Sequence, residues 1–223
     1  MSDVAWEQLS LTGEHDVATY TRNEVLAINP AHTKNGERVA DLHRLGYLPE
    51  PVLDPTYGEG SMWTHHRPEI LVAHDLNPAK NDGPWPSHDF RDMPYSNGMF
   101  PSCLYDPPYR FAGTPTDTEE GGHDDLYGTD VYRTKSEQLA LIIDGARECA
   151  RVTDQFLIVK CQDQVVAGST FFQTMAVNEH LERVGWVLKD RLHLLSYRPQ
   201  PAGRSQKNAR NNFSTFLVFV PVG

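Results

Sequence analysis

The chain has 223 residues, of which 39 % are hydrophobic and 22 % charged, a composition that predicts one folded domain over 1–223 and excludes wholesale disorder. No apolar run approaches the roughly 18 residues of a membrane span, and acidic residues stand where a signal peptide carries Lys or Arg, so we expect a cytoplasmic protein with no membrane partner. Thirty acidic residues against 20 basic ones give a net charge of −10, which argues against a protein that coats nucleic acid without specificity.

Short apolar runs alternate with helical stretches along the chain, which is the pattern of an α/β fold. Residues 1–30 form an N-terminal extension, after which Val39, Leu42 and Leu45 place an apolar stripe on a helix that ends at Gly46. Strands of a sheet that is covered on both faces are near-continuous apolar runs. Four such runs are predicted as strands, at 51–54, 69–75, 102–106 and 155–161, and a short further strand is expected near 88–90.

Two helices and a hairpin are predicted in the second half of the chain. Thr134 and Glu137 have the spacing of a capping box and mark the start of a helix. A second helix is expected over 170–183, closed by Gly185 in the position that favours a left-handed cap. The chain ends in a predicted antiparallel hairpin, whose two β-rich runs are 186–197 and 212–222.

The first chemical signal is the glycine-containing segment Asp54–Gly60 at the end of the first predicted strand. Glycines let a backbone pass close to a ligand, and open α/β sheets bind cofactors at the carboxyl ends of their strands. A dinucleotide fingerprint needs a third glycine where Trp63 stands, so NAD is not indicated, and a tight turn is the alternative. Asp75 ends the second strand at the spacing of an acid that bonds a ribose diol. For Asp75 the alternative is a cap on the loop at Asn77.

A nucleoside-type cofactor, rather than a metal, is the ligand that these acids indicate. Asp89 precedes Phe90 at a spacing that suits a contact to an adenine amino group; Asp92 is the rival candidate, and ordinary loop polarity is the alternative for both. The three cysteines are widely spaced and form neither a disulfide framework nor a metal knuckle. The pair His65-His66 is interpreted as surface polarity after the glycine loop, so no metal site is expected.

The strongest signal is the tetrapeptide Asp106-Pro107-Pro108-Tyr109, directly after an apolar strand. Two prolines fix the backbone and remove two N–H donors, so the segment presents carbonyls and the Asp106 carboxylate as acceptors. Acceptors suit an exocyclic base amine, because hydrogen bonds from its hydrogens raise the electron density on the attacking nitrogen, and Tyr109 can stack on the face of the base. The alternative is a proline-stiffened turn with a surface tyrosine.

Together, the two motifs resemble those of the S-adenosylmethionine (SAM)-dependent DNA amino-methyltransferases, the adenine-N6 and cytosine-N4 group. Asp54–Gly60 is similar to the cofactor loop of that family, and Asp106–Tyr109 to its catalytic DPPY tetrapeptide. The segment 31–35 resembles the one that holds the methionine end of the cofactor, and 157–163 and 210–219 resemble two of the family's strands. The resemblance implies a single-domain, Rossmann-like class I methyltransferase fold, with a seven-stranded, mostly parallel sheet and an antiparallel last strand.

The same resemblance implies SAM as cofactor and methyl transfer to the exocyclic amine of a nucleobase. Adenine N6 in DNA is preferred because the tetrapeptide begins with Asp and ends with Tyr. Methylation of cytosine N4 or of an RNA base, and a non-catalytic nucleic-acid or protein-binding module that kept the fold, are the alternatives. The implied catalytic residues are Asp106, Pro107, Pro108 and Tyr109, and the implied cofactor-binding residues are Lys34, Asp54, Pro55, Thr56, Gly58, Gly60, Asp75, Asp89 and Phe90.

Nucleic acid, with DNA as the first choice, is the expected partner, and two loops of opposite charge bear on how it binds. In the insertion 110–133, six acids between Arg110 and Tyr132 oppose the single base Arg110, which predicts a lid, a partner contact or a plain solvated loop. Between Tyr109 and Thr134 there is room for a loop but not for a large target-recognition domain, so sequence specificity is not indicated unless a short element, a second copy in a homodimer or a separate specificity protein supplies it. Basic residues of the hairpin loop are expected to pair with phosphates that flank a flipped base: Arg198, Arg204, Lys207 and Arg210.

Overall fold

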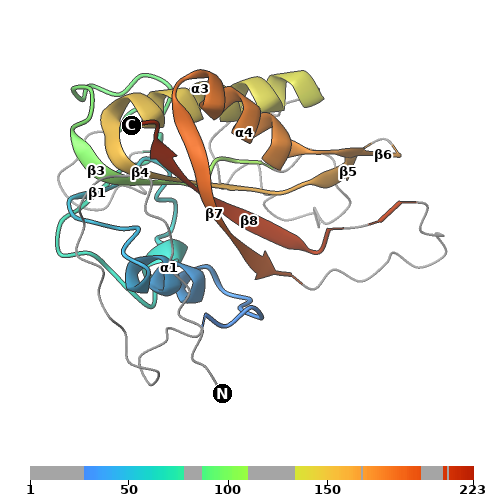
Figure 1. The fold of residues 1–223 in the computed structure, drawn as a ribbon, viewed down its shortest axis with the longest axis horizontal. Helices are drawn as coiled ribbons and strands as arrows, with labels where there is room; N and C mark the ends of the chain where they lie inside the picture. The colour runs from blue at the N-terminus through green and yellow to red at the C-terminus, as the bar shows by residue number, and fades with distance from the viewer. Residues whose placement is uncertain (1–27, 78–86, 110–133, 167, 197–207, 210) are drawn as a thin grey trace, which may run out of the picture.

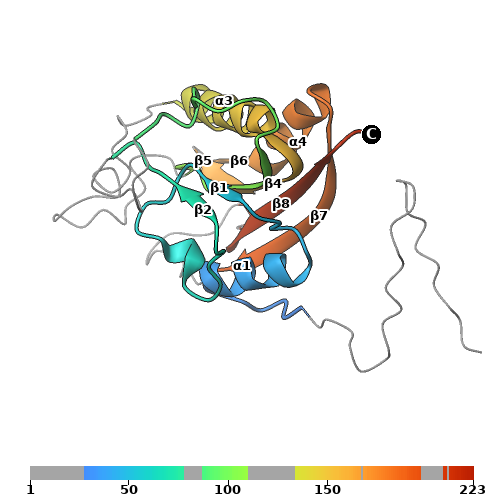
Figure 2. The ribbon, with the colours of Figure 1, turned by 90° about the vertical axis from the view of Figure 1, so that its left-hand side faces the viewer.

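The computed structural model describes residues 28–77, 87–109, 134–166, 168–196, 208–209 and 211–223. The insertion 110–133, most of the N-terminal extension and the four basic residues of the hairpin loop therefore lie outside the described residues. A central sheet has helices on both faces (Figure 1 and Figure 2). Helices α3 (Lys135–Val152) and α4 (Gln173–Arg183) lie over one face, and α1 (Asn35–Arg44) lies over the other.

The main sheet has six strands in the described part of the chain, in the order β2-β1-β3-β4-β8-β7. The first four are parallel to one another, and β8 is inserted antiparallel between β4 and β7. The antiparallel last strand and the mostly parallel sheet confirm the predicted fold class, with six strands described where seven were expected. The bounds are β1 (Val52–Asp54), β2 (Leu71–Ala73), β3 (Phe100–Tyr105), β4 (Thr153–Cys161), β7 (Trp186–Leu195) and β8 (Phe213–Pro221).

All four predicted core strands form, because each apolar run has both faces covered. Val52, Leu104 and Ile158 face the α1 side, and Leu53, Cys103 and Leu157 face the α3 side, each within its own hydrophobic cluster. This alternation follows from the two-residue period of a strand. The predicted helices form as well. Thr134 Oγ1 accepts from the Glu137 backbone N–H at 3.2 Å, and Gly185 adopts a φ of 85° after α4.

Two sequence-based expectations need correction. Residues 170–171 are not helical: they belong to β6 (Ser169–Phe171), which pairs with β5 (Gln164–Val166) in a separate two-stranded sheet, so α4 begins at Gln173. The strand expected near 88–90 does not form. There the Asp89 carboxylate accepts from the Arg91 backbone N–H at 2.9 Å, and this local bond makes a turn.

Helix α3 is the longest helix of the described residues and packs on β3 and β4. Its buried face contributes Leu141, Ile142 and Ala146 to the core cluster. Among the described helices, none combines the length and the apolar character needed to cross a bilayer. The carboxyl ends of the parallel strands β1, β2 and β3 lie at one edge of the sheet. The glycine-containing segment and the tetrapeptide follow these strand ends.

Candidate functional site

Three aspartates lie at the carboxyl ends of three neighbouring parallel strands. Asp54 is the last residue of β1, Asp75 follows β2 by two residues, and Asp106 directly follows β3. Because β1 pairs with both β2 and β3 in parallel, the three strand ends share one edge of the sheet. The structure thus places the glycine segment and the tetrapeptide at the same edge, as the sequence predicted for a ligand site in an open α/β sheet.

Asp54 is buried, with 1 % of its surface exposed, and its hydrogen bonds go to the protein. Oδ2 accepts from Trp63 Nε1 at 2.7 Å, and Oδ1 accepts from the Thr56 backbone N–H at 2.9 Å. Burial and, to a smaller extent, the nearby Asp106 carboxylate raise the pKa of Asp54 to about 7, against the opposing effect of these hydrogen bonds. The buried carboxylate therefore fixes the start of the glycine loop through its hydrogen bonds to Thr56. Trp63, which breaks the dinucleotide fingerprint, holds Asp54 in this position.

The loop after Asp54 turns sharply through Gly58 and Gly60, whose φ angles are 56° and 71°. Residues with a Cβ rarely adopt this left-handed conformation, so the glycines permit the turn. The Gly58 backbone N–H donates to Asp75 Oδ2 at 3.1 Å, and the Asn77 N–H donates to Asp75 Oδ1 at 2.9 Å. The loop cap that was the alternative for Asp75 thus exists. The same half-buried carboxylate also joins the end of β2 to the glycine loop.

The Thr56 hydroxyl connects the glycine loop to the tetrapeptide. Its oxygen accepts from the Asp106 backbone N–H at 3.0 Å and donates to Asp54 Oδ1 at 3.3 Å. The two segments are 50 residues apart in the sequence, and this contact fixes where the tetrapeptide begins relative to the loop. Sequence reasoning placed Thr56 among the cofactor residues but did not anticipate its contact with Asp106.

Lys160 is a component of the site that the sequence analysis missed. Its Nζ lies 3.0 Å from Asp106 Oδ2, and the lysine is 5 % exposed. Nζ also lies 5.4 Å from the ring centroid of Tyr109 and 5.7 Å from that of Phe216. Burial is the largest single effect and disfavours the ammonium, but the Asp106 carboxylate and Tyr109 together outweigh burial and raise the pKa of Lys160 above its usual value. The sequence feature that could have identified Lys160 is its position as the single lysine in the apolar run 155–161.

Glutamine side chains hold the second half of the tetrapeptide. Gln138 of α3 donates from Nε2 to the Pro108 carbonyl. The Tyr109 carbonyl accepts from Gln164 Nε2 of β5 at 2.6 Å and from Gln173 Nε2 of α4 at 2.9 Å. We call Gln138, Gln164 and Gln173 the glutamine clamp. Gln138 and Gln173 are fully buried. The clamp fixes the backbone around Pro108 and Tyr109 from three different elements.

Three further residues predicted to bind the cofactor, Lys34, Asp89 and Phe90, differ in exposure and in hydrogen bonding. Lys34 is exposed at the start of α1, and its neighbour Asn35 donates from Nδ2 to Ser61 Oγ, just after the glycine loop, at 3.4 Å. Asp89 Oδ1 accepts from Arg91 Nε at 2.9 Å, and these hydrogen bonds lower the pKa of Asp89. Phe90 is buried, and its ring packs edge-on against Tyr105 in the core, 5.3 Å between centroids.

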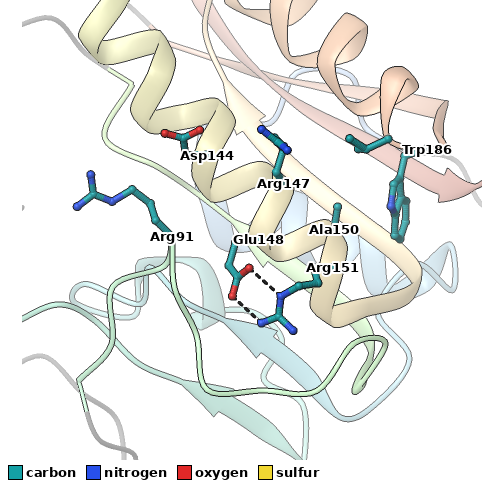
Figure 3. A pocket seen from close by; sticks show the side chains of 8 residues that line it. Arg91, Asp144, Arg147, Glu148, Ala150, Arg151 and Trp186 are labelled. Atoms are coloured by element: carbon teal, nitrogen blue, oxygen red, sulfur yellow. Dashed lines mark hydrogen bonds and ion pairs between the residues drawn. The ribbon is translucent and has the colours of Figure 1, made fainter.

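A separate open groove of about 540 Å³ lies along the C-terminal half of α3 (Figure 3). Arg147 and Asp144 of α3 line it, and Trp186 borders it at the start of β7. Arg151 and Glu148 pair with each other in its wall. The groove contains none of the residues predicted for the site, and in the described part of the chain no cluster of three or more His, Cys, Asp or Glu residues has the arrangement of a metal site.

Comparisons with known proteins bear on the fold. No protein-family profile matches the sequence. Subunit I of an NAD(P)H-quinone oxidoreductase from Rippkaea orientalis is 38 % identical over 72 residues, but this match covers 29 % of the chain and 37 % of that protein. The structure of TrmN from Thermus thermophilus has a TM-score of 0.50 and 14 % identity over 83 % of the chain.

Two further solved structures are similar at lower scores. A provisionally assigned DNA modification methylase, also from Thermus thermophilus and complexed with SAM, has a TM-score of 0.41 and 16 % identity over 60 % of the chain. Magnesium protoporphyrin IX methyltransferase from Synechocystis PCC 6803, with bound SAH, has a TM-score of 0.49 and 13 % identity over 84 % of the chain and 81 % of that protein. The chain spans about half the length of the first two, 48 % of TrmN and 51 % of the methylase.

The strand order with an inserted antiparallel β8, and the likeness to TrmN, define the class of the fold. The chain has the Rossmann-like fold of methyltransferases.

Proposed function

We propose that the protein is a SAM-dependent methyltransferase that modifies the exocyclic amino group of a nucleobase, with adenine N6 in DNA as the first choice. One observation carries this proposal: Thr56 Oγ1 accepts from the Asp106 N–H at 3.0 Å, so the glycine loop and the acceptor-rich tetrapeptide form one site. A loop for a cofactor and a group for an amine, held side by side, are what methyl transfer requires.

The residues around the glycine loop fit a nucleoside cofactor. Asp75 presents a half-buried carboxylate at the end of β2, and this is a hydrogen-bond acceptor of the kind that a ribose diol needs. Gly58 and Gly60 keep side chains off the turn. We assign Asp75 to the ribose and the loop backbone to the rest of the cofactor. The methyltransferase class of the fold supports SAM as that cofactor.

The tetrapeptide fits an amine target. The Asp106 carboxylate accepts hydrogen bonds from the amine and stabilises the positive charge that develops on its nitrogen, and Tyr109 holds the plane of a flipped base. When bound, SAM supplies an electrophilic methyl group on a sulfonium sulfur. Transfer would form the N–C bond and break the S–C bond, whose electron pair would stay on sulfur, and the methylated amine would lose one proton to solvent.

The direct test is incubation of the purified protein with methyl-labelled SAM and separate pools of DNA, RNA and protein, followed by mass spectrometry of the hydrolysed products. We expect label in N6-methyladenine from the DNA pool. Asp106→Ala is expected to lower transfer by about 10²-fold or more while SAM affinity, measured by calorimetry, stays close to that of the parent.

Other results of the same experiment separate the alternatives. Label in N4-methylcytosine or in an RNA base would keep the amine chemistry and change the substrate. SAM binding without transfer to any pool would favour a binding module that retained the fold. An Asp106→Ala variant with the turnover of the parent would refute the assigned mechanism, whichever product forms.

A further inference from the structure

The contact between Lys160 and Asp106 has a definite origin in the sheet. Strand β4 pairs with β3 in parallel, and Tyr105 lies opposite Val159. One step further along both strands come Asp106 and Lys160, whose side chains meet at 3.0 Å. By strand alternation, Lys160 lies on the same face as Ile158, and Asp106 on the same face as Leu104. The ion pair therefore follows directly from the register of β3 and β4.

Stability does not account for a lysine at this position. Its neighbours Ile158 and Val159 are fully buried, and an apolar side chain of similar length would pack in the same place without losing the hydration of an ammonium. A buried ion pair is weak support for a fold, because the cost of desolvation offsets most of the attraction. The charge of Lys160 thus calls for a role other than stabilisation.

The electrostatics of the site supply such a role. The carboxylates of Asp54 and Asp106 repel each other, and this repulsion contributes to the raised pKa of Asp54. Tyr109 and Cys161 also interact electrostatically with the pair, and neither carries a positive charge. Lys160 supplies a buried positive charge 3.0 Å from the Asp106 carboxylate, and it lies deeper than Asp106, whose side chain is 22 % exposed against 6 % for Lys160.

Building on the proposed function, we propose that Lys160 is a positioning residue, which holds the Asp106 carboxylate ionised and in one orientation so that the carboxylate meets the target amine. Lys160 donates from its buried position to Oδ2 of Asp106, and the glutamine clamp fixes the backbone that follows Asp106. A fixed, ionised carboxylate suits this role, because an acceptor that must first reorient or lose a proton stabilises the transition state less.

The test compares Lys160→Met, which removes the charge at similar length, with Lys160→Arg, which keeps it. The first measurement follows the Asp106 carboxyl by carbon NMR during a pH titration, with Asp106→Asn to assign its signal. We expect the titration midpoint of Asp106 in Lys160→Met to rise by about one pH unit or more, as for a carboxylate that loses a neighbouring cation, and to stay near that of the parent in Lys160→Arg.

The second measurement is the pH profile of methyl transfer. For Lys160→Met, we expect kcat to fall by up to about 10²-fold, the acid limb to move upward with the Asp106 midpoint, and calorimetric SAM affinity to stay unchanged. Lys160→Arg is expected to restore the acid limb. If Lys160→Met does not fold, Lys160→Gln takes its place, since it can bond to Asp106 without a charge.

Two failures are distinguishable. An unchanged Asp106 midpoint in a folded, uncharged variant overturns the role of Lys160, even if methyl transfer is found. A parent protein that transfers no methyl group overturns the proposed function, whereas the carboxyl titration still decides whether Lys160 controls Asp106.

Discussion

Replacing Thr56 by valine removes one hydroxyl while preserving most of the shape of the side chain. In the structure this hydroxyl accepts from the Asp106 backbone N–H at 3.0 Å and donates to Asp54 at 3.3 Å. The variant therefore breaks the connection between the glycine loop and the tetrapeptide and leaves the Asp106 N–H without that acceptor.

The size of the effect follows from these two bonds. A buried N–H that loses its partner costs about 1–3 kcal/mol, and the lower half of that range applies because Asp106 is half-buried. The 3.3 Å bond to Asp54 is long and adds little. We expect a loss of about 1–2 kcal/mol in the free energy of unfolding, which lowers the ratio of folded to unfolded protein by roughly 5- to 30-fold.

Urea unfolding of the parent, Thr56→Val and Thr56→Ser measures this loss, with the serine variant as a control that keeps the hydroxyl. Methyl transfer is measured in parallel, because a shifted Asp106 backbone misplaces the carboxylate. A valine variant with the stability and turnover of the parent would refute the claim that this hydroxyl couples the two segments. A serine variant that loses as much as the valine variant would show that the hydroxyl alone does not account for the effect, because serine keeps the hydroxyl and lacks the methyl group.

Three further predictions concern charge. Because the pKa of Asp54 is raised to about 7, its protonated form stabilises the fold below pH 4, and this contribution is lost as pH rises to 7. Urea unfolding between pH 4 and 7 should show that the free energy of unfolding of the parent falls by at most about 4 kcal/mol, whereas that of Asp54→Asn does not. Parallel pH dependences of the two proteins would contradict this prediction. Asp75→Ala should weaken calorimetric SAM binding by roughly 1–3 kcal/mol, and an unchanged affinity would remove Asp75 from the cofactor site. Arg204→Ala with Lys207→Ala should weaken DNA binding and flatten its salt dependence by roughly one log unit per lost phosphate contact, and a parental salt slope would mean that the substrate binds elsewhere.

The sheet was predictable because its strands carry an explicit signal. Apolar runs such as 155–161 mark buried parallel strands, and the capping box at Thr134 marks a helix start. The hairpin of β5 and β6 was not predictable, because strands of three residues are too short to show a periodicity.

The individual motifs of the candidate site were predictable, but their supports were not. The glycine segment and the tetrapeptide are local patterns. Lys160 and the glutamine clamp reach the tetrapeptide from positions 30 to 64 residues away in the sequence. Their contacts depend on the register between β3 and β4 and on the packing of α3 and α4, and neither can be derived from a single sequence.

The glutamine clamp limits the number of hydrogen-bond acceptors that the tetrapeptide can offer to a target amine. A carbonyl oxygen has two lone pairs, and that of Tyr109 already accepts from two amides. In the proposed reaction, we expect a base to meet the Asp106 carboxylate and the Pro107 carbonyl, two acceptors for the two hydrogens of an unmodified amine. A methylated amine keeps one hydrogen and leaves one of these acceptors unsatisfied. Under the proposed function, we therefore expect the site to bind its substrate better than its product, which would favour release after a single transfer.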